Sequence, residues 1–202
     1  MNRLSDPDRF RVPSFLVLTL AIVALASAAR AGTIEGKVAG GTGQGVVYVD
    51  SIPGKTFPAS TEHALINQQG LAFHPSLLVV QTGTTVDFQN DDSVQHNVFW
   101  PSVGGNKKEG HNLGTWPKGE KRPFKFTQPG VVPLLCNVHP EMSGYIVVSP
   151  TPYFAETDSS GGYKIQNVPD GQYNVVAWRQ GAKTQTLPVT VSGSGKAGFT
   201  LK

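Results

Sequence analysis

Three soft or borderline side chains follow one another at short spacing in the segment LLCNVHPEM. Cys136, the only cysteine in the 202-residue chain, stands three residues before His139 and six before Met142. Thiolate, imidazole and thioether groups can each give an electron pair to a transition metal. The segment lies between two runs of β-forming residues, so a short loop would bring the three side chains towards one point. The spacing therefore suggests metal binding.

Three ligands from one loop rarely enclose an ion, so a fourth is expected from elsewhere in the chain. His96, in QHNVFW, begins another predicted strand after the turn-like segment NDDSVQ. One thiolate, two imidazoles and a thioether form the donor set of a blue-copper site, in which methionine is a weak axial ligand. Zinc sites favour Cys and His without a thioether. Copper is therefore the expected metal.

Each of these four residues also has an ordinary structural interpretation. Cys136 could be a buried small hydrophobe, the two histidines could be satisfied polar residues, and Met142 could fill a gap in the core. We favour the metal because the four suitable residue types occur together, in this order and in this context. The sequence contains no His-x-His pair, so the trinuclear centre of a multicopper oxidase is not expected. A single cysteine also excludes a two-thiolate dinuclear copper centre.

The remaining histidines are expected to have structural rather than metal-binding roles. His74 is predicted at a strand edge and His111 in a Gly-rich loop, and each could approach the metal or face water. His63 is expected to be solvated.

The elements that must position the ligands are short runs rich in Val, Ile, Phe and Tyr, separated by turn residues. The chain has 23 Gly and 15 Pro, and this pattern is typical of an all-β protein. No amphipathic helix is expected beyond the N-terminal segment. Thirteen candidate strands are too many for one small sandwich and predict two. They cover residues 33–38, 46–50, 63–68, 76–81, 84–90, 96–100, 122–127, 131–137, 144–149, 161–168, 172–179, 185–191 and 197–202.

Residues 60–149 resemble the cupredoxins, the blue type 1 copper proteins. LAFHPSLLVVQTGTTVDFQNDDSVQHNVFWP is similar to the strands before and around that family's first histidine. CNVHPEM matches its Cys-x-x-His-x-x-Met loop, in the short form of amicyanins and pseudoazurins. With its additional β segments, the chain looks more like the methylamine-utilisation-type cupredoxin proteins.

The resemblance implies a Greek-key β-sandwich that holds one type 1 copper ion. The implied ligands are His96, Cys136 and His139, with Met142 in the axial position. It also implies a hydrogen bond from the backbone N–H of Asn97 to the Cys136 sulfur, a contact that tunes the reduction potential of the metal.

A second resemblance covers about a quarter of the chain. TDSSGGYKIQNVPDGQYNVVAWR is similar to carboxypeptidase regulatory-like, or prealbumin-like, β-sandwich modules with the signature TD…G.Y.I.NVP.G.Y.V. The hairpin that precedes this run in the family, of the type G.V.G…VYV, matches GTIEGKVAGGTGQGVVYVD near the other end. We expect residues 32–56 and 150–202 to fold together, with the copper domain of residues 60–149 inserted between them. Two sequential domains remain the alternative.

The N-terminal residues 1–31 are predicted to be a secretory signal. Arg3, Arg9 and Arg11 precede the apolar run FLVLTLAIVALA, and ARA stands before Gly32. The run is too short for a confident membrane span, although an uncleaved anchor helix is the alternative. Cleavage would change 17 basic and 14 acidic residues to 13 and 12. The basic residues are scattered, so no nucleic-acid partner is expected.

These features predict an exported protein, periplasmic or secreted, that passes single electrons between redox partner proteins and is not inserted stably in a membrane after cleavage. A filled coordination sphere leaves no place for a substrate, so an enzyme is not expected. His96 should be the more buried imidazole, and His139 should reach the surface. Val138, Pro140 and Trp100 are expected to form a small docking patch for transient partners, with packing of Trp100 in the core as an equal alternative. The sequence leaves the oligomeric state open.

Two other functions fit the same ligands. The protein could be a copper carrier or reservoir without redox turnover. It could also be a structural or adhesion module in which copper only stabilises the inserted domain.

Overall fold

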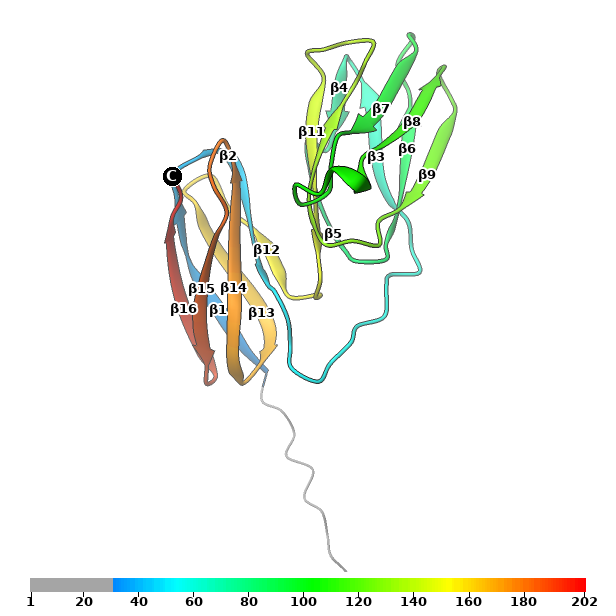
Figure 1. The fold of residues 1–202 in the computed structure, drawn as a ribbon. Helices are drawn as coiled ribbons and strands as arrows, with labels where there is room; N and C mark the ends of the chain where they lie inside the picture. The colour runs from blue at the N-terminus through cyan, green and yellow to red at the C-terminus, as the bar shows by residue number, and fades with distance from the viewer. Residues whose placement is uncertain (1–30) are drawn as a thin grey trace, which may run out of the picture.

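The computed structural model describes residues 31–202, which form two β-sandwiches (Figure 1). The all-β fold class is confirmed, because the helical structure in this part of the chain is limited to one 3-10 turn, η1 (Lys107–Glu109). No helix in these residues is long and apolar enough to cross a membrane. The predicted secretory signal lies outside the described residues except for Ala31.

The sandwich formed by the middle of the chain, called the copper domain below after the metal that the sequence predicts, packs a five-stranded sheet on a four-stranded sheet. The first sheet has the order β5-β11-β10-β7-β8, with β5 (Leu77–Gln81), β11 (Ser143–Ser149), β10 (Gly130–Leu135), β7 (His96–Trp100) and β8 (His111–Trp116). The second has the order β4-β3-β6-β9, with β4 (Ala72–His74), β3 (Ala64–Gln69), β6 (Thr85–Asn90) and β9 (Lys121–Lys125).

Alternating side chains build the core of this sandwich. Val86 and Phe88 of β6 are fully buried in one hydrophobic cluster with Phe126 and Trp100. Trp100 stacks on Phe88 with ring centroids 6.2 Å apart. The period-two pattern of the sequence therefore correctly predicts which side chains of this strand face the core. Trp100 is only 1% exposed, so of its two expected places the surface docking patch is wrong and the core is confirmed.

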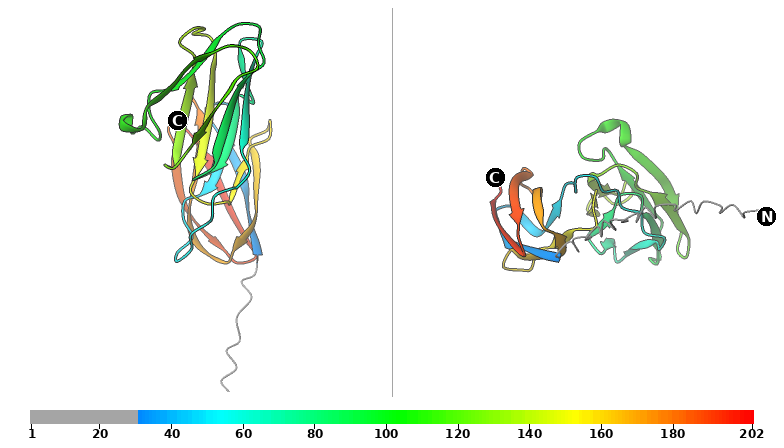
Figure 2. Two further views of the ribbon diagram at one scale, coloured as in Figure 1. Left: turned by 90° about the vertical axis from the view of Figure 1, so that its right-hand side faces the viewer. Right: turned by 90° about the horizontal axis from the view of Figure 1, so that it is seen from below.

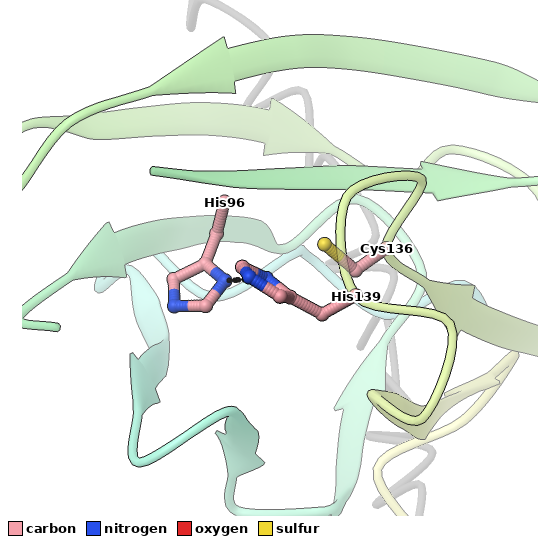
Figure 3. A group of neighbouring side chains, drawn as sticks. All are labelled: His96, Cys136 and His139. Atoms are coloured by element: carbon pink, nitrogen blue, oxygen red, sulfur yellow. Dashed lines mark hydrogen bonds between the residues drawn. The ribbon is translucent and has the colours of Figure 1, made fainter. Parts of the chain in front are cut away.

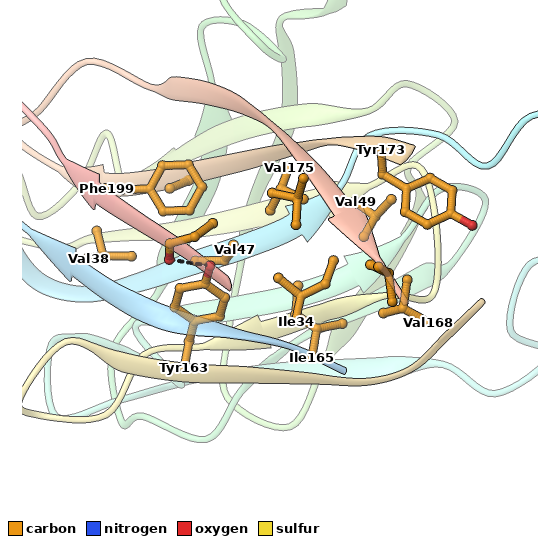
Figure 4. Close-up of a cluster of buried hydrophobic side chains, with 14 of the residues drawn as sticks. Ile34, Val38, Val47, Val49, Tyr163, Ile165, Val168, Tyr173, Val175 and Phe199 are labelled. Carbon is orange, nitrogen blue, oxygen red and sulfur yellow. Dashed lines mark hydrogen bonds between the residues drawn. The ribbon is translucent and has the colours of Figure 1, made fainter. Parts of the chain in front are cut away.

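The second sandwich, called the terminal sandwich below, is built from both ends of the described chain (Figures 1 and 4). One sheet has the order β13-β1-β16, with β13 (Gly162–Pro169), β1 (Ala31–Ala39) and β16 (Ser194–Thr200). The other has the order β12-β2-β14-β15, with β12 (Phe154–Glu156), β2 (Thr42–Val49), β14 (Gly171–Gln180) and β15 (Gln185–Val191).

The first strand of this sandwich lies between two strands from the C-terminal region. β1 pairs antiparallel with β13 and parallel with β16, and Ile34 lies opposite Ile165 and Gly195. Gly36 permits this close approach, because a Cβ atom there would lie 1.7 Å from the carbonyl oxygen of Ala197. The core between the sheets contains Tyr163, whose hydroxyl donates to the same carbonyl at 2.8 Å (Figure 4).

The expected hairpin between the first two strands is wrong. β1 and β2 follow each other directly but belong to opposite sheets, because β2 pairs with β12 and β14 instead. The turn at Gly40 and Gly41, both with positive φ, carries the chain from one layer to the other. The strands of residues 31–49 thus pair with strands beyond residue 153, while the exact domain limits stay a prediction.

All thirteen predicted strands are present, and three further strands were missed. β4 and β12 have only three residues each and lie beside a turn or prolines, so they show no period-two pattern. β8 was expected to be a loop that contains His111. It forms because His111 and Trp116 lie opposite Trp100 and His96 of β7, with an irregularity in the register between Asn97 and Phe99.

The two sandwiches touch through the outer faces of two sheets (Figure 2). Val46 and Trp178 of the terminal sandwich form one buried cluster with Leu77 and Val147 of the copper domain. The ring centroids of Tyr145 and Trp178 are 5.0 Å apart. The contact is apolar and buried, so it holds the two sandwiches against each other.

The chain leaves the terminal sandwich and returns to it at one place. The Thr151 hydroxyl donates to the carbonyl oxygen of Val49 at 2.7 Å, and the Val49 N–H donates to that of Tyr153 at 2.9 Å. Thr151 is only 2% exposed. These buried bonds fix the return of the chain beside the end of β2.

We expect Trp178→Ala to lower the free energy of unfolding by about 3 kcal/mol, because it empties the centre of the contact between the sandwiches. Chemical denaturation followed by circular dichroism would measure the change. Leu65→Ala is the control, because Leu65 is 49% exposed and its loss should cost less than about 0.5 kcal/mol. Equal effects of the two substitutions would contradict the importance of this contact.

Candidate metal centre

Three of the four candidate ligands, His96, Cys136 and His139, lie close together (Figure 3). His96 is the first residue of β7, and Cys136 directly follows β10. β7 and β10 are antiparallel neighbours, and Leu135, the last residue of β10, lies opposite Phe99. The chain that continues past β10 to Cys136 therefore runs back towards His96 at the start of β7. His139 comes from the loop between β10 and β11. Strand pairing thus joins residues that are forty positions apart in the sequence.

The geometry of the three side chains suits one metal ion. The nearest ligand atoms of His96, Cys136 and His139 all lie within 4.8 Å of one another. The two Nδ1 atoms face each other at 3.0 Å, so both can reach one ion at bond lengths of roughly 2.0–2.1 Å, as for zinc–imidazole sites. His96 is fully buried and Cys136 is 4% exposed, whereas His139 is partly exposed. The expected difference in burial between the two imidazoles is confirmed.

The predicted hydrogen bond to the thiol sulfur is also present. The backbone N–H of Asn97 donates to Cys136 Sγ at 3.4 Å. The Asn97 side chain donates to Asn112 Oδ1 and to the Gly114 carbonyl, both at 2.8 Å, and accepts from the Asn137 N–H at 3.3 Å. Asn97 therefore ties the ligand loop to β8 as well as to β7.

Sequence reasoning missed a carboxylate at this site. Asp92 Oδ2 lies 3.0 Å from Nε2 of His96, the nitrogen that points away from the other ligands. The backbone N–H of Leu71 donates to the same carboxylate at 3.0 Å. The Leu71 hydrogen bond, followed by that from His96, lowers the pKa of Asp92 below its ordinary value. The available signal was an acid four residues before the histidine, in a turn that leads into its strand.

Met142 lies in the same hydrophobic cluster as Cys136 and is only 1% exposed. Its backbone N–H donates to the carbonyl oxygen of His139 at 3.0 Å, which closes a turn in the ligand loop. The loop therefore holds the thioether in the buried interior, within the hydrophobic cluster that also contains Cys136. A buried thioether also packs well as core.

The other histidines lie away from the cluster. His111 packs against Trp100 and Phe124, with ring centroids 5.5 and 4.8 Å away. His74 Nε2 bonds to the carbonyl oxygen of Gln69 at 3.1 Å. His63 is half exposed and contacts Asp87 at 3.0 Å. In residues 31–202, the one cluster of three potential His, Cys or acidic ligands is His96, Cys136 and His139.

Two family models match the chain. Residues 61–149 match the copper binding proteins of the plastocyanin/azurin family. Residues 143–199 match domain II of polysaccharide lyase family 4. The second match differs from the carboxypeptidase regulatory-like modules that the sequence resembles, and that resemblance stays a prediction.

Several solved structures are similar to the copper domain. A purple cupredoxin from Nitrosopumilus maritimus is 30% identical, with 43% of this chain and 99% of that chain covered and a TM-score of 0.39. A reduced amicyanin mutant is 22% identical, with 45% and 85% covered and a TM-score of 0.41. A Cu-containing nitrite reductase from Thermus scotoductus SA-01 is 27% identical, with 50% and 25% covered and a TM-score of 0.41.

A β-sandwich with a buried His-Cys-His cluster at one end defines a copper-binding domain. Through residues 61–149 the chain belongs to the cupredoxins, the plastocyanin/azurin family of copper-binding proteins. The residues present fit one copper ion, because a thiolate and two imidazoles converge and the thiolate receives a hydrogen bond.

We expect Asn97→Ala to lower the free energy of unfolding of the metal-free protein by about 2 kcal/mol, because three hydrogen bonds of a buried side chain are lost. Thermal and chemical unfolding would measure the loss. Asn137→Ala is the matched control, because that side chain is exposed and the backbone N–H remains. An unchanged stability of Asn97→Ala would show that this network contributes little.

Proposed function

We propose that the protein is a mononuclear type 1 copper protein that transfers single electrons between redox partners. The observation that carries the proposal is the convergence of His96, Cys136 and His139 within 4.8 Å in a buried site. Copper bound to such a set can alternate between Cu(I) and Cu(II) with little change of geometry. We assign these three residues as its ligands.

Met142 is the proposed axial ligand. It lies on the same loop as Cys136 and His139, and its side chain is buried in the same cluster as the cysteine. A long, weak thioether contact is the usual axial partner of a thiolate and two imidazoles, and it tunes the reduction potential.

His139 is the proposed point of electron entry and exit. Its ring is partly exposed, whereas His96 and Cys136 are buried. The neighbouring Val138 is 47% exposed, and Pro140 is exposed as well. An apolar surface of this kind suits the small, transient contacts of redox proteins. The partners proposed are therefore redox proteins. The predicted secretory signal places them in the periplasm or outside the cell, and the scattered basic residues do not favour nucleic acids.

Carrier and enzyme functions are less favoured. A copper carrier needs a ligand set that releases its ion, whereas this site is largely buried and tied to two strands. The nitrite reductase similarity covers 25% of that enzyme, and four ligands at one ion leave no open position for a substrate. A structural role for the terminal sandwich is compatible with electron transfer in the copper domain.

We expect Cu(II) to give the metal-free protein an intense absorption near ~600 nm, from charge transfer between thiolate and copper. Cys136→Ser and His96→Ala should abolish it. His63→Ala should leave it unchanged, because that side chain is 51% exposed and lies outside the cluster. A wild-type protein that stays colourless while Cys136 reacts as a free thiol would overturn the proposal.

Repeated redox cycling separates an electron carrier from a copper carrier. With an equimolar copper chelator present, alternate reduction by ascorbate and oxidation by ferricyanide should restore the full absorption after each cycle, because the fixed ligands hold both copper states. Progressive transfer of copper to the chelator would favour the carrier function instead.

A further inference from the structure

The buried imidazole of His96 uses both ring nitrogens. Nδ1 faces Nδ1 of His139 at 3.0 Å, and Nε2 faces Asp92 Oδ2 at 3.0 Å. His96 is fully buried, while the Asp92 side chain is 17% exposed. The carboxylate therefore lies at the boundary between the site and the solvent, behind one ligand of the proposed copper ion.

Asp92 is held in place independently of the histidine. Its two carboxylate oxygens accept hydrogen bonds from the backbone N–H groups of Leu71 and Ser93, each at 3.0 Å. Its own N–H donates to Asn90 Oδ1 at 2.9 Å. Asn90 is fully buried and donates to the carbonyl oxygens of Val94 and Trp116 at 2.9 and 3.0 Å. The carboxylate is thus a fixed acceptor.

Hydrogen-bond bookkeeping then assigns the protons of the metal-free site. An ionised carboxylate only accepts, so the proton of His96 must be on Nε2. When the His96 ring is neutral, its Nδ1 then carries a lone pair. The contact between the two Nδ1 atoms then requires His139 to donate, which places its proton on Nδ1.

We propose that Asp92 is a positioning residue that fixes His96 in the Nε2–H tautomer, aims its Nδ1 lone pair at the metal position and favours Cu(II) over Cu(I). A carboxylate hydrogen-bonded to a ligating histidine fixes the ring and raises its basicity. The more basic imidazole and the added negative charge both stabilise the higher oxidation state. The part that concerns copper rests on the proposed function, whereas the tautomer applies to the metal-free protein.

The two imidazoles differ in this respect. His139 has His96 as its one side-chain hydrogen-bond partner among residues 31–202. Since His139 has no carboxylate behind it, we infer that His96 is the fixed imidazole and His139 the adjustable one. Asp92 thereby provides a site with one anchored ligand and one ligand open to the surface.

The choice of substitution follows from this geometry. His96 Nε2 and the Leu71 N–H both contact Asp92 Oδ2, whereas the Ser93 N–H donates to Oδ1. In Asp92→Asn an amide oxygen in the place of Oδ1 still accepts from Ser93, while the amide nitrogen in the place of Oδ2 donates and would favour a lone pair on Nε2 of His96. The substitution therefore favours the tautomer that is wrong for the metal. Asp92→Ala serves as a second variant, because it removes the acceptor without supplying a donor.

Asp91→Asn is the matched control. It removes the same charge one residue away, and the Asp91 carboxylate accepts from Asn67 Nδ2 at 2.8 Å and from Gln89 Nε2 at 2.7 Å, not from a histidine. A general electrostatic effect would appear in both substitutions. An effect through the His96 ring would appear only in those of Asp92.

The first experiment uses the full metal-free protein. Long-range ¹H–¹⁵N NMR of the histidine rings should show His96 as the Nε2–H tautomer and His139 as the Nδ1–H tautomer in the wild type and in Asp91→Asn. Asp92→Asn should move His96 towards the Nδ1–H tautomer. A wild-type His96 protonated on Nδ1, or an unchanged ring in Asp92→Asn, would overturn the inference.

The second experiment measures Cu(II) and Cu(I) affinities by competition, together with the reduction potential. We expect the Asp92 substitutions to weaken Cu(II) binding about 10–100-fold and to lower the ratio of Cu(II) to Cu(I) affinity about tenfold, which is a rise of ~59 mV in potential. Asp91→Asn should change the ratio less than about threefold, because its charge is screened.

The two proposals fail in different ways. A colourless wild-type protein with copper would refute the type 1 site but leave the NMR result intact. A blue wild-type protein whose affinity ratio is the same in Asp92→Asn and Asp92→Ala would refute the role of Asp92 and leave the type 1 site intact.

Discussion

The pairing of β7 with β10 is the constraint on which the metal centre depends. The two strands are antiparallel with Leu135 opposite Phe99, so the chain beyond β10 runs back towards the start of β7, and His96 and Cys136 meet although they are forty positions apart. The backbone N–H of Asn97 then reaches the sulfur as part of the same strand geometry. The short loop supplies His139 at the same end. The sheet thus positions His96 and Cys136, and the loop adds His139 as the one adjustable ligand.

The fold and three ligands of the copper domain could be predicted from the sequence because two independent signals agreed. The loop CNVHPEM gave three candidate ligands by spacing, and period-two patterns such as Val86 and Phe88 gave the strands that surround them. His111 was misplaced, and the place of Trp100 was left open between surface and core, for a common reason. Both belong to an aromatic cluster with Phe124, and an aromatic residue beside a Gly-rich segment reads equally well as surface or core until the partner strand is known. Asp92 was missed because its importance depends on the direction of one ring nitrogen, which spacing does not reveal.

The terminal sandwich shows a different limit of sequence reasoning. Its inward residues were predictable from alternation, for example Tyr163 and Ile165 in β13. The assignment of β1 and β2 to opposite sheets was not, because two adjacent alternating runs joined by glycines resemble a hairpin. Strand pairing with segments more than a hundred residues away decides between a hairpin and two separate sheets. β1 pairs with β16, and β2 pairs with β14.

The parallel pairing of β1 with β16 imposes an order on folding. Thr33 lies opposite Ser194 and Ala39 opposite Thr200, so this edge of the sheet cannot close until the chain has been synthesised as far as residue 200. The strands of the copper domain are contiguous and have much shorter loops to close. Because loop closure must precede distant contacts, we expect the metal-binding unit to fold early and to serve as the template on which the two ends of the polypeptide come together.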